Sequence, residues 1–200
     1  MRIRSLQDAS EGERIRPCGV PGKTTYDIRR MAAVFSLCDS LTMSELVFRQ
    51  AGLDDALGMA QVRAGDWSSE EFWIPRIRAY LAGDSHPRQA LSPRLAYVCL
   101  DGEVIVGLIA GHLTRRFGCD GELQWLSVRP AYRGRGVATE LLRRLWQWFI
   151  ERKAHHICGD VQPANETARR FYRSHGADDL KPSWMVWKDI RQPTMNKFSQ

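Results

Sequence analysis

Apolar and polar residues follow two different rhythms along this chain, one typical of strands and the other typical of helices. From Ser44 onward, short runs of alternating or continuous apolar residues are separated by stretches in which apolar residues return every three or four positions. This alternation of strands with helices predicts a mixed α/β domain. The predicted strands are 46–50, 94–100, 103–114, 122–128, 157–161 and 183–189, and the predicted helices are 53–63, 68–81, 137–153 and 166–175.

Short polar motifs predict where several of these elements begin and end. Ser68-Ser-Glu-Glu71 has the spacing of a capping box and is predicted to open the second helix. Asp101-Gly102 lies between two apolar runs and predicts a tight hairpin turn. Gly176 follows the last helix and predicts a left-handed residue at its end. Loops are expected at 83–93 and 117–121.

The first 42 residues differ from the rest, because Gly, Pro, Arg and Glu are mixed there without a clear period. This composition predicts a poorly ordered extension over 1–42, a folded domain over 43–190 and a tail over 191–200. Two interpretations of the extension stay open. Translation begins at Met43, or the extension is a functional arm.

Composition and charge exclude several classes of protein. The formal net charge is +6, but basic and acidic residues nearly balance over 44–190, so the basic face expected of a nucleic-acid-binding protein is missing. No apolar run reaches the length of about 18 residues that a membrane span requires, and no secretory signal is evident. The five cysteines show no spacing suited to zinc or to a disulfide framework. We therefore expect a cytoplasmic protein without a bound metal, membrane or nucleic acid.

The most informative segment is a glycine-rich loop between a predicted strand and a predicted helix. Gly134 and Gly136 precede the helix at 137–153, where several N–H groups would converge near the positive end of the helix dipole and form a seat for a diphosphate. Thr139 occupies the place of the third glycine in a dinucleotide-binding motif, which excludes that class. The loop also lacks the Lys-Ser/Thr pair of a nucleotide-binding P-loop.

Two motifs together resemble the GNAT superfamily of N-acetyltransferases. Arg133-x-x-Gly136-x-Ala138 is similar to the acetyl-CoA loop of that family. The segment 165–172, Asn-Glu-Thr-Ala-Arg-Arg-Phe-Tyr, with Gly176 after it, is similar to the family's second motif. Ala177 departs from the aromatic residue usual there. The resemblance covers about 44–190 and implies a mixed, mostly antiparallel sheet flanked by helices and splayed between its fourth and fifth strands.

The resemblance implies a binding site for acetyl-CoA, used as a co-substrate. By analogy, the backbones of Leu126, Ser127 and Val128 would hold the pantetheine arm and the thioester, beside the gap in the sheet. Asn165 would touch the cofactor arm or cap its helix. The diphosphate would bind the main-chain amides of Arg133, Gly134, Arg135, Gly136, Val137, Ala138 and Thr139.

The resemblance also implies a catalytic role for a tyrosine and a carboxylate. Tyr172 matches the family's general acid, which protonates the departing CoA thiolate. Glu122 and Asp160 each match a position where some members carry a general base, and Glu122 is the preferred candidate. Attack by the amine is expected to be direct, because neither motif supplies a cysteine nucleophile, although Cys158 lies close by. Histidines 112, 155 and 156 are interpreted as structural.

The sequence therefore predicts transfer of an acetyl group from acetyl-CoA to a primary amine. The acceptor stays open among protein N-termini, lysine side chains and small-molecule amines, and the protein is expected to be a monomer or homodimer. Two other functions compete with this one. The first is a non-catalytic acyl-CoA sensor, and the second is a nucleic-acid-binding protein that uses Arg129, Arg133 and Arg135.

Overall fold

The computed structural model describes residues 45–65, 68–84 and 90–191. The predicted extension at 1–42 and all but the first residue of the predicted tail at 191–200 lie outside these ranges. Among the described residues, no helix combines the length and the apolar character needed to cross a bilayer.

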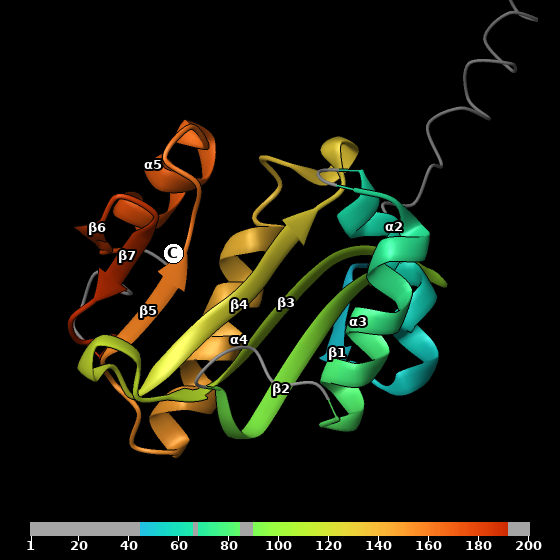
Figure 1. Ribbon diagram of the computed structural model, residues 1–200. Coiled ribbons are helices and arrows are strands. Elements are labelled where there is room, and N and C mark those ends of the chain that lie inside the picture. The colour runs from blue at the N-terminus through green and yellow to red at the C-terminus, as the bar shows by residue number, and fades with distance from the viewer. Residues whose placement is uncertain (1–44, 66–67, 85–89, 192–200) are drawn as a thin grey trace, which may run out of the picture. The chain divides into compact units, whose positions relative to one another are not determined.

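A single sheet of seven strands forms the centre of the described domain, in the order β1-β2-β3-β4-β5-β7-β6. Neighbouring strands are antiparallel except β4 and β5, which are parallel (Figure 1). This arrangement confirms the predicted mixed, mostly antiparallel sheet. The strands are β1 (Val47–Gln50), β2 (Ala90–Asp101), β3 (Val104–Thr114), β4 (Gly121–Val128), β5 (Ile157–Asp160), β6 (Asp178–Lys181) and β7 (Trp184–Trp187).

Helices cover both faces of the sheet. On one face lie α2 (Ala56–Ala64) and α3 (Glu70–Ala82), whose apolar side chains form one core cluster with β2 and β3. On the other face lies α4 (Val137–Glu151), which packs in a second cluster (Figure 1). The last helix, α5 (Glu166–Ser174), follows β5 and joins the second cluster through Tyr172. Three short 3₁₀ segments complete the domain: η1 (Leu53–Asp55), η2 (Arg116–Gly118) and η3 (Pro130–Tyr132).

Glycines on β3 and β4 let α4 lie very close to the sheet. A Cβ atom at Gly107 would come within 2.9 Å of Val137, and one at Gly111 would come within 2.9 Å of Leu145. At Gly121 an added Cβ would lie only 2.3 Å from Phe149. Because protein interiors are packed without spare volume, these contacts fix the depth of α4. They thereby fix where its N-terminus meets the end of β4.

Most boundaries lie within about two residues of the predicted ones, and four features depart from the prediction in other ways. Ser69, and not Ser68, caps α3, because its side chain accepts the N–H of Phe72. The hairpin between β2 and β3 turns at Gly102-Glu103, one residue later than predicted. The predicted loop at 83–93 is shorter, because β2 already begins at Ala90. Strand β6 was not predicted, because its sequence, Asp-Asp-Leu-Lys, has the polarity of a loop; it exists by pairing with β7.

Candidate active site

Strands β4 and β5 pair over only three residues and then separate. The paired residues are Gly121 with Ile157, Glu122 with Cys158 and Leu123 with Gly159, whereas β4 continues to Val128. The separation coincides with a β-bulge. Leu123 and Trp125 pair with adjacent residues of β3, so that Gln124 between them is the extra residue. Bulges bend strands and redirect side chains, and this one leaves the second half of β4 with an edge that β5 does not cover.

The backbone of β4 presents alternate residues to that uncovered edge. The N–H of Arg129 donates to the carbonyl of Val106 on β3 at 2.8 Å. Since backbone groups point to alternate sides along an antiparallel strand, Ser127 also directs its backbone toward β3, and Leu126 and Val128 direct theirs away. Of the three residues predicted to bind the pantetheine arm, Leu126 and Val128 thus have the suitable backbone orientation.

The glycine-rich loop places the start of α4 directly after β4. Gly134 and Gly136 have φ angles of 74° and 81°, and no atom lies within 4 Å of a Cβ added to either. Gly136 is the N-cap of α4, and the first helical hydrogen bond runs from the N–H of Glu140 to its carbonyl at 3.0 Å. The amides of Val137, Ala138 and Thr139 precede that bond. They are therefore available to an anion at the positive end of the helix.

Two arginines that flank the loop hold the protein backbone. The Nε atom of Arg129 donates to the carbonyl of Ile105 at 2.8 Å, and that of Arg133 donates to the carbonyl of Val128 at 3.0 Å. The guanidinium of Arg135 lies 5.0 Å from the ring of Tyr132. Arg129 and Arg133 are thus engaged with backbone carbonyls at the loop, which weakens the alternative that the three arginines form a nucleic-acid-binding patch.

Tyr172 lies on α5 and is almost completely buried, with 6% of its surface exposed. Its ring packs edge-to-face against Trp187 at 5.3 Å. Burial raises the pKa of Tyr172 to about 12, although the positive charge of Arg63 opposes this. The phenol therefore keeps its proton at neutral pH. Asn165 caps the helix, since its side chain accepts the N–H of Ala168 at 3.1 Å.

Glu122 is buried and lies against Arg116 and His112. Its Oε2 atom accepts from Nε of Arg116 at 2.9 Å and lies 3.6 Å from Nε2 of His112. Burial alone would raise the pKa of Glu122, but the hydrogen bonds and charges of His112 and Arg116 outweigh it and lower the pKa. A carboxylate held in this way is a weak base.

Asp160 lies at the end of β5 on the other side of the gap, and it differs from Glu122 in its electrostatics. The residue is exposed, yet the surrounding protein removes enough water from its carboxylate to raise the pKa above the usual range. The negative charge of Glu122 adds to this increase, and Arg116 opposes it. Raised basicity together with exposure is the combination that a general base requires.

Cys158 has the properties of a core residue. It is fully buried and clusters with Cys119 and Val186. The adjacent thiol of Cys119, followed by burial, raises the pKa of Cys158 far above its ordinary value. A thiol that stays protonated is a poor nucleophile, which agrees with direct attack on the donor.

Several residues near the gap could not be foreseen from the sequence. Arg63 of α2 donates to the hydroxyl of Ser127 at 3.2 Å and stacks on Trp73 at 4.0 Å, and Trp125 lies beside them. The contacts of Arg63 with Ser127 and Trp125 join residues more than sixty positions apart in the chain. No local pattern marks such a contact, because it depends on how α2 crosses the sheet.

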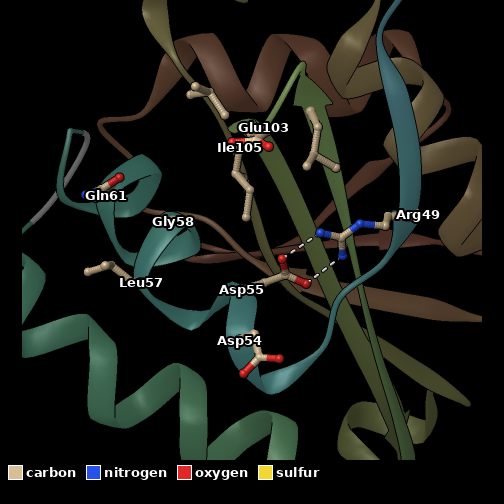
Figure 2. Close-up of a pocket in the computed structure, with 10 residues that line it drawn as sticks. Arg49, Asp54, Asp55, Leu57, Gly58, Gln61, Glu103 and Ile105 are labelled. Carbon is tan, nitrogen blue, oxygen red and sulfur yellow. Dashed lines mark hydrogen bonds and ion pairs between the residues drawn. The ribbon is translucent and has the colours of Figure 1, made fainter.

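A separate cavity of about 330 Å³ lies between α2 and the β2–β3 hairpin. Figure 2 shows two of its lining residues, Asp55 and Arg49, joined in a two-bonded ion pair, with N–O distances of 2.7 and 2.8 Å. None of the residues predicted for the active site lines this cavity. The lining residues are Arg49, Asp54, Asp55, Leu57, Gly58, Gln61, Leu100, Glu103, Val104 and Ile105.

Comparison with known proteins agrees with this geometry. Residues 55–177 match the model of the acetyltransferase (GNAT) family. A GNAT-family protein from Desulfovibrio desulfuricans is similar in structure, with a TM-score of 0.59 and 14% identity over 72% of this chain and 97% of its own. The PaiA N-acetyltransferase of Thermoplasma acidophilum was solved with coenzyme A. It has a TM-score of 0.56 and 15% sequence identity, and the match covers 72% of this chain and 99% of its own. An aminoglycoside N-acetyltransferase was also solved with coenzyme A. It has a TM-score of 0.57 and 18% sequence identity, and the match covers 69% of this chain and 91% of its own. Among curated proteins, no sequence matches.

Proposed function

The chain belongs to the GNAT family of acetyltransferases, and we propose that it transfers the acetyl group of acetyl-CoA to a primary amine by direct attack in a ternary complex. We place this activity in residues 43–190. The acceptor is a protein N-terminus, a lysine side chain or a small-molecule amine.

The observation that carries the proposal is the uncovered edge of β4 next to the N-terminus of α4. The backbone groups of Leu126 and Val128 face away from β3, although the carbonyl of Val128 already accepts from Nε of Arg133. A pantetheine arm can pair with the backbone of Leu126 and the N–H of Val128 as an added strand does. Past the end of the strand, Gly134 and Gly136 leave open space around the backbone. The amides from Gly134 to Thr139 then supply donors for the diphosphate. The predicted amide of Arg133 does not join them, because it already donates to the carbonyl of Pro130 at 3.2 Å. That two structural neighbours were solved with coenzyme A supports this assignment.

The residues around the gap supply the steps of the transfer. The amine loses a proton to a carboxylate and attacks the thioester carbon, and the C–S bond breaks. A main-chain N–H at the uncovered edge of β4 stabilises the negative oxygen that forms, an effect worth about 3–4 kcal/mol in comparable sites. The O–H of Tyr172 protonates the departing thiolate, so that free CoA leaves as a thiol. The phenolate left on Tyr172 then takes up a proton from solvent, and the carboxylate releases the proton that it accepted from the amine.

We assign the general base to Asp160 in preference to Glu122. The sequence favoured Glu122, but its carboxylate is bound to Arg116 and its pKa is lowered. The pKa of Asp160 is raised, and the residue is exposed to solvent, from which an amine would arrive. The negative charge of Glu122 then helps to raise the pKa of Asp160.

The test is a free-CoA release assay with purified protein, acetyl-CoA and a panel of amines that includes peptides, polyamines and aminoglycosides. The proposal predicts thiol release with at least one acceptor and a much lower rate for Tyr172→Phe. If acetyl-CoA binds but no amine increases thiol release, the protein is an acyl-CoA sensor.

A further inference from the structure

The side chain of His175 links the first turn of α4 to the last turn of α5. Its Nε2 atom lies 3.0 Å from the hydroxyl of Thr139, and its Nδ1 atom lies 2.7 Å from the carbonyl oxygen of Phe171. A carbonyl oxygen can only accept a hydrogen bond, so Nδ1 carries the ring proton. Nε2 is then the acceptor, and Thr139 donates to it.

The surroundings of the ring favour this neutral form. The imidazole is half-buried and stacks on Phe171 with ring centroids 4.1 Å apart. Burial lowers the pKa of His175, although the bond to Phe171 opposes this effect. The hydroxyl of Ser174 lies 3.1 Å from Nδ1 and itself donates to the Phe171 carbonyl. The orientation of the ring is thus fixed from both sides.

The backbone of His175 contacts the residues that support Tyr172. Its N–H donates to the carbonyl of Tyr172 at 3.0 Å, and its carbonyl accepts from the indole N–H of Trp187 at 3.1 Å. Trp187 in turn packs edge-to-face on Tyr172. The side chain of His175 therefore contacts Thr139 in the proposed diphosphate site. The backbone of His175 contacts Trp187, which packs on the proposed general acid Tyr172.

We infer that His175 is a positioning residue that couples the diphosphate seat at Thr139 to the orientation of Tyr172. This inference rests on the proposed function. The amide of Thr139 is one of the donors for the diphosphate, so a bound diphosphate holds the first turn of α4 in place. The Thr139–His175 bond passes this constraint to α5, and the phenol of Tyr172 is better aligned when the seat is filled.

The experiment compares two donors, acetyl-CoA and S-acetylpantetheine, which lacks the diphosphate. When binding of the diphosphate improves the alignment of groups at the distant reaction centre, the binding energy raises kcat. We expect His175→Leu and Thr139→Val each to lower kcat with acetyl-CoA about fivefold, the equivalent of one neutral hydrogen bond of about 1 kcal/mol. With S-acetylpantetheine, His175→Leu should leave kcat unchanged. The double variant should lose no more than either single one, because both remove the same bond.

Three further variants complete the test. His175→Gln keeps an acceptor near the Nε2 position, and Thr139→Ser keeps the hydroxyl, so both should retain most of the kcat with acetyl-CoA. Arg173→Gln breaks the ion pair between α5 and Asp179 of β6 without touching α4, and it should affect the two donors equally. Equal losses with both donors in His175→Leu, or no loss with acetyl-CoA in either His175→Leu or Thr139→Val, would overturn the inference. A wild-type protein that acetylates nothing with either donor would instead overturn the proposed function.

Discussion

Leu123 on β4 pairs with Gly159 on β5, and this is the last backbone pair before the two parallel strands separate. The next residue of β4, Gln124, is the extra residue of a bulge against β3. Separation and bulge thus occur within one position of each other. The uncovered edge of Leu126 and Val128 is therefore a local property of β4, and the proposed chemistry follows from what can bind there.

Replacing Gly136 by Val should raise the Kd of acetyl-CoA at least tenfold. A residue with a Cβ resists the left-handed backbone of the N-cap, which costs about 1–2 kcal/mol, and the new side chain projects into the open space that the diphosphate needs. Titration calorimetry measures the effect.

Gly83→Val is the matched control for Gly136→Val. Gly83 has a φ of 83° and is similarly open, but it caps α3. It should therefore show a comparable loss of stability with an unchanged Kd. An unchanged Kd in Gly136→Val as well would mean that the diphosphate binds elsewhere.

Tyr172→Phe should lower kcat about a hundredfold, in the range that general acid catalysis contributes, with little change in the Kd of acetyl-CoA. Since the pKa of Tyr172 is raised to about 12, the phenol stays protonated through the accessible range. The wild-type rate should therefore show no alkaline decline from this group. A rate in Tyr172→Phe within twofold of wild type would exclude the tyrosine as the acid.

Asp160→Asn should abolish the acid limb of the pH–rate profile for kcat/KM and lower the rate at neutral pH. Because the pKa of Asp160 is raised, that limb should lie above the pH range in which an ordinary aspartate titrates. The base must be ionised to act, so activity rises with pH through this pKa. A profile unchanged in Asp160→Asn but lost in Glu122→Gln would return the role to Glu122.

Glu122→Gln should reduce stability by about 1–3 kcal/mol, because it removes the charge that faces half-buried Arg116 and buried His112. The folded-state pKa of Glu122 is lowered. The stabilisation of the fold by the Glu122 carboxylate is therefore fully present above the unfolded-state pKa. It is lost as the pH falls through the folded-state pKa. Urea unfolding at neutral and acidic pH should show the difference between wild type and variant shrinking on acidification. A constant difference would contradict the assigned ion pairs.

Gly121→Ala should destabilise the domain by about 1–3 kcal/mol, the usual cost of overpacking. The added methyl group would meet Phe149 at 2.3 Å and Ile157 at 2.8 Å. Gly52→Ala, where no atom lies within 4 Å of the new Cβ, is the matched control and should be nearly neutral in thermal unfolding. Equal melting temperatures for the two variants would show that α4 packs less closely on β4 than described.

The sequence was sufficient for features that local chemistry determines. The loop at Gly134 and Gly136, the cap at Asn165 and the apolar stripe of α4 all depend on residues within a few positions of one another. Features that depend on tertiary pairing were not accessible. The polar strand β6 exists because β7 lies beside it, and Glu122 meets His112 because β3 and β4 adopt one particular register. The preference between Glu122 and Asp160 changed for the same reason, because their surroundings set their pKa values.

The most direct test of the account is a crystal structure of the protein soaked or grown with acetyl-CoA. We predict the pantetheine arm along Leu126 and Val128, with the diphosphate at the amides from Gly134 to Thr139 and the thioester sulfur within reach of Tyr172. A bound acetyl-CoA at any other place, or no binding at millimolar concentration in a parallel titration, would contradict it.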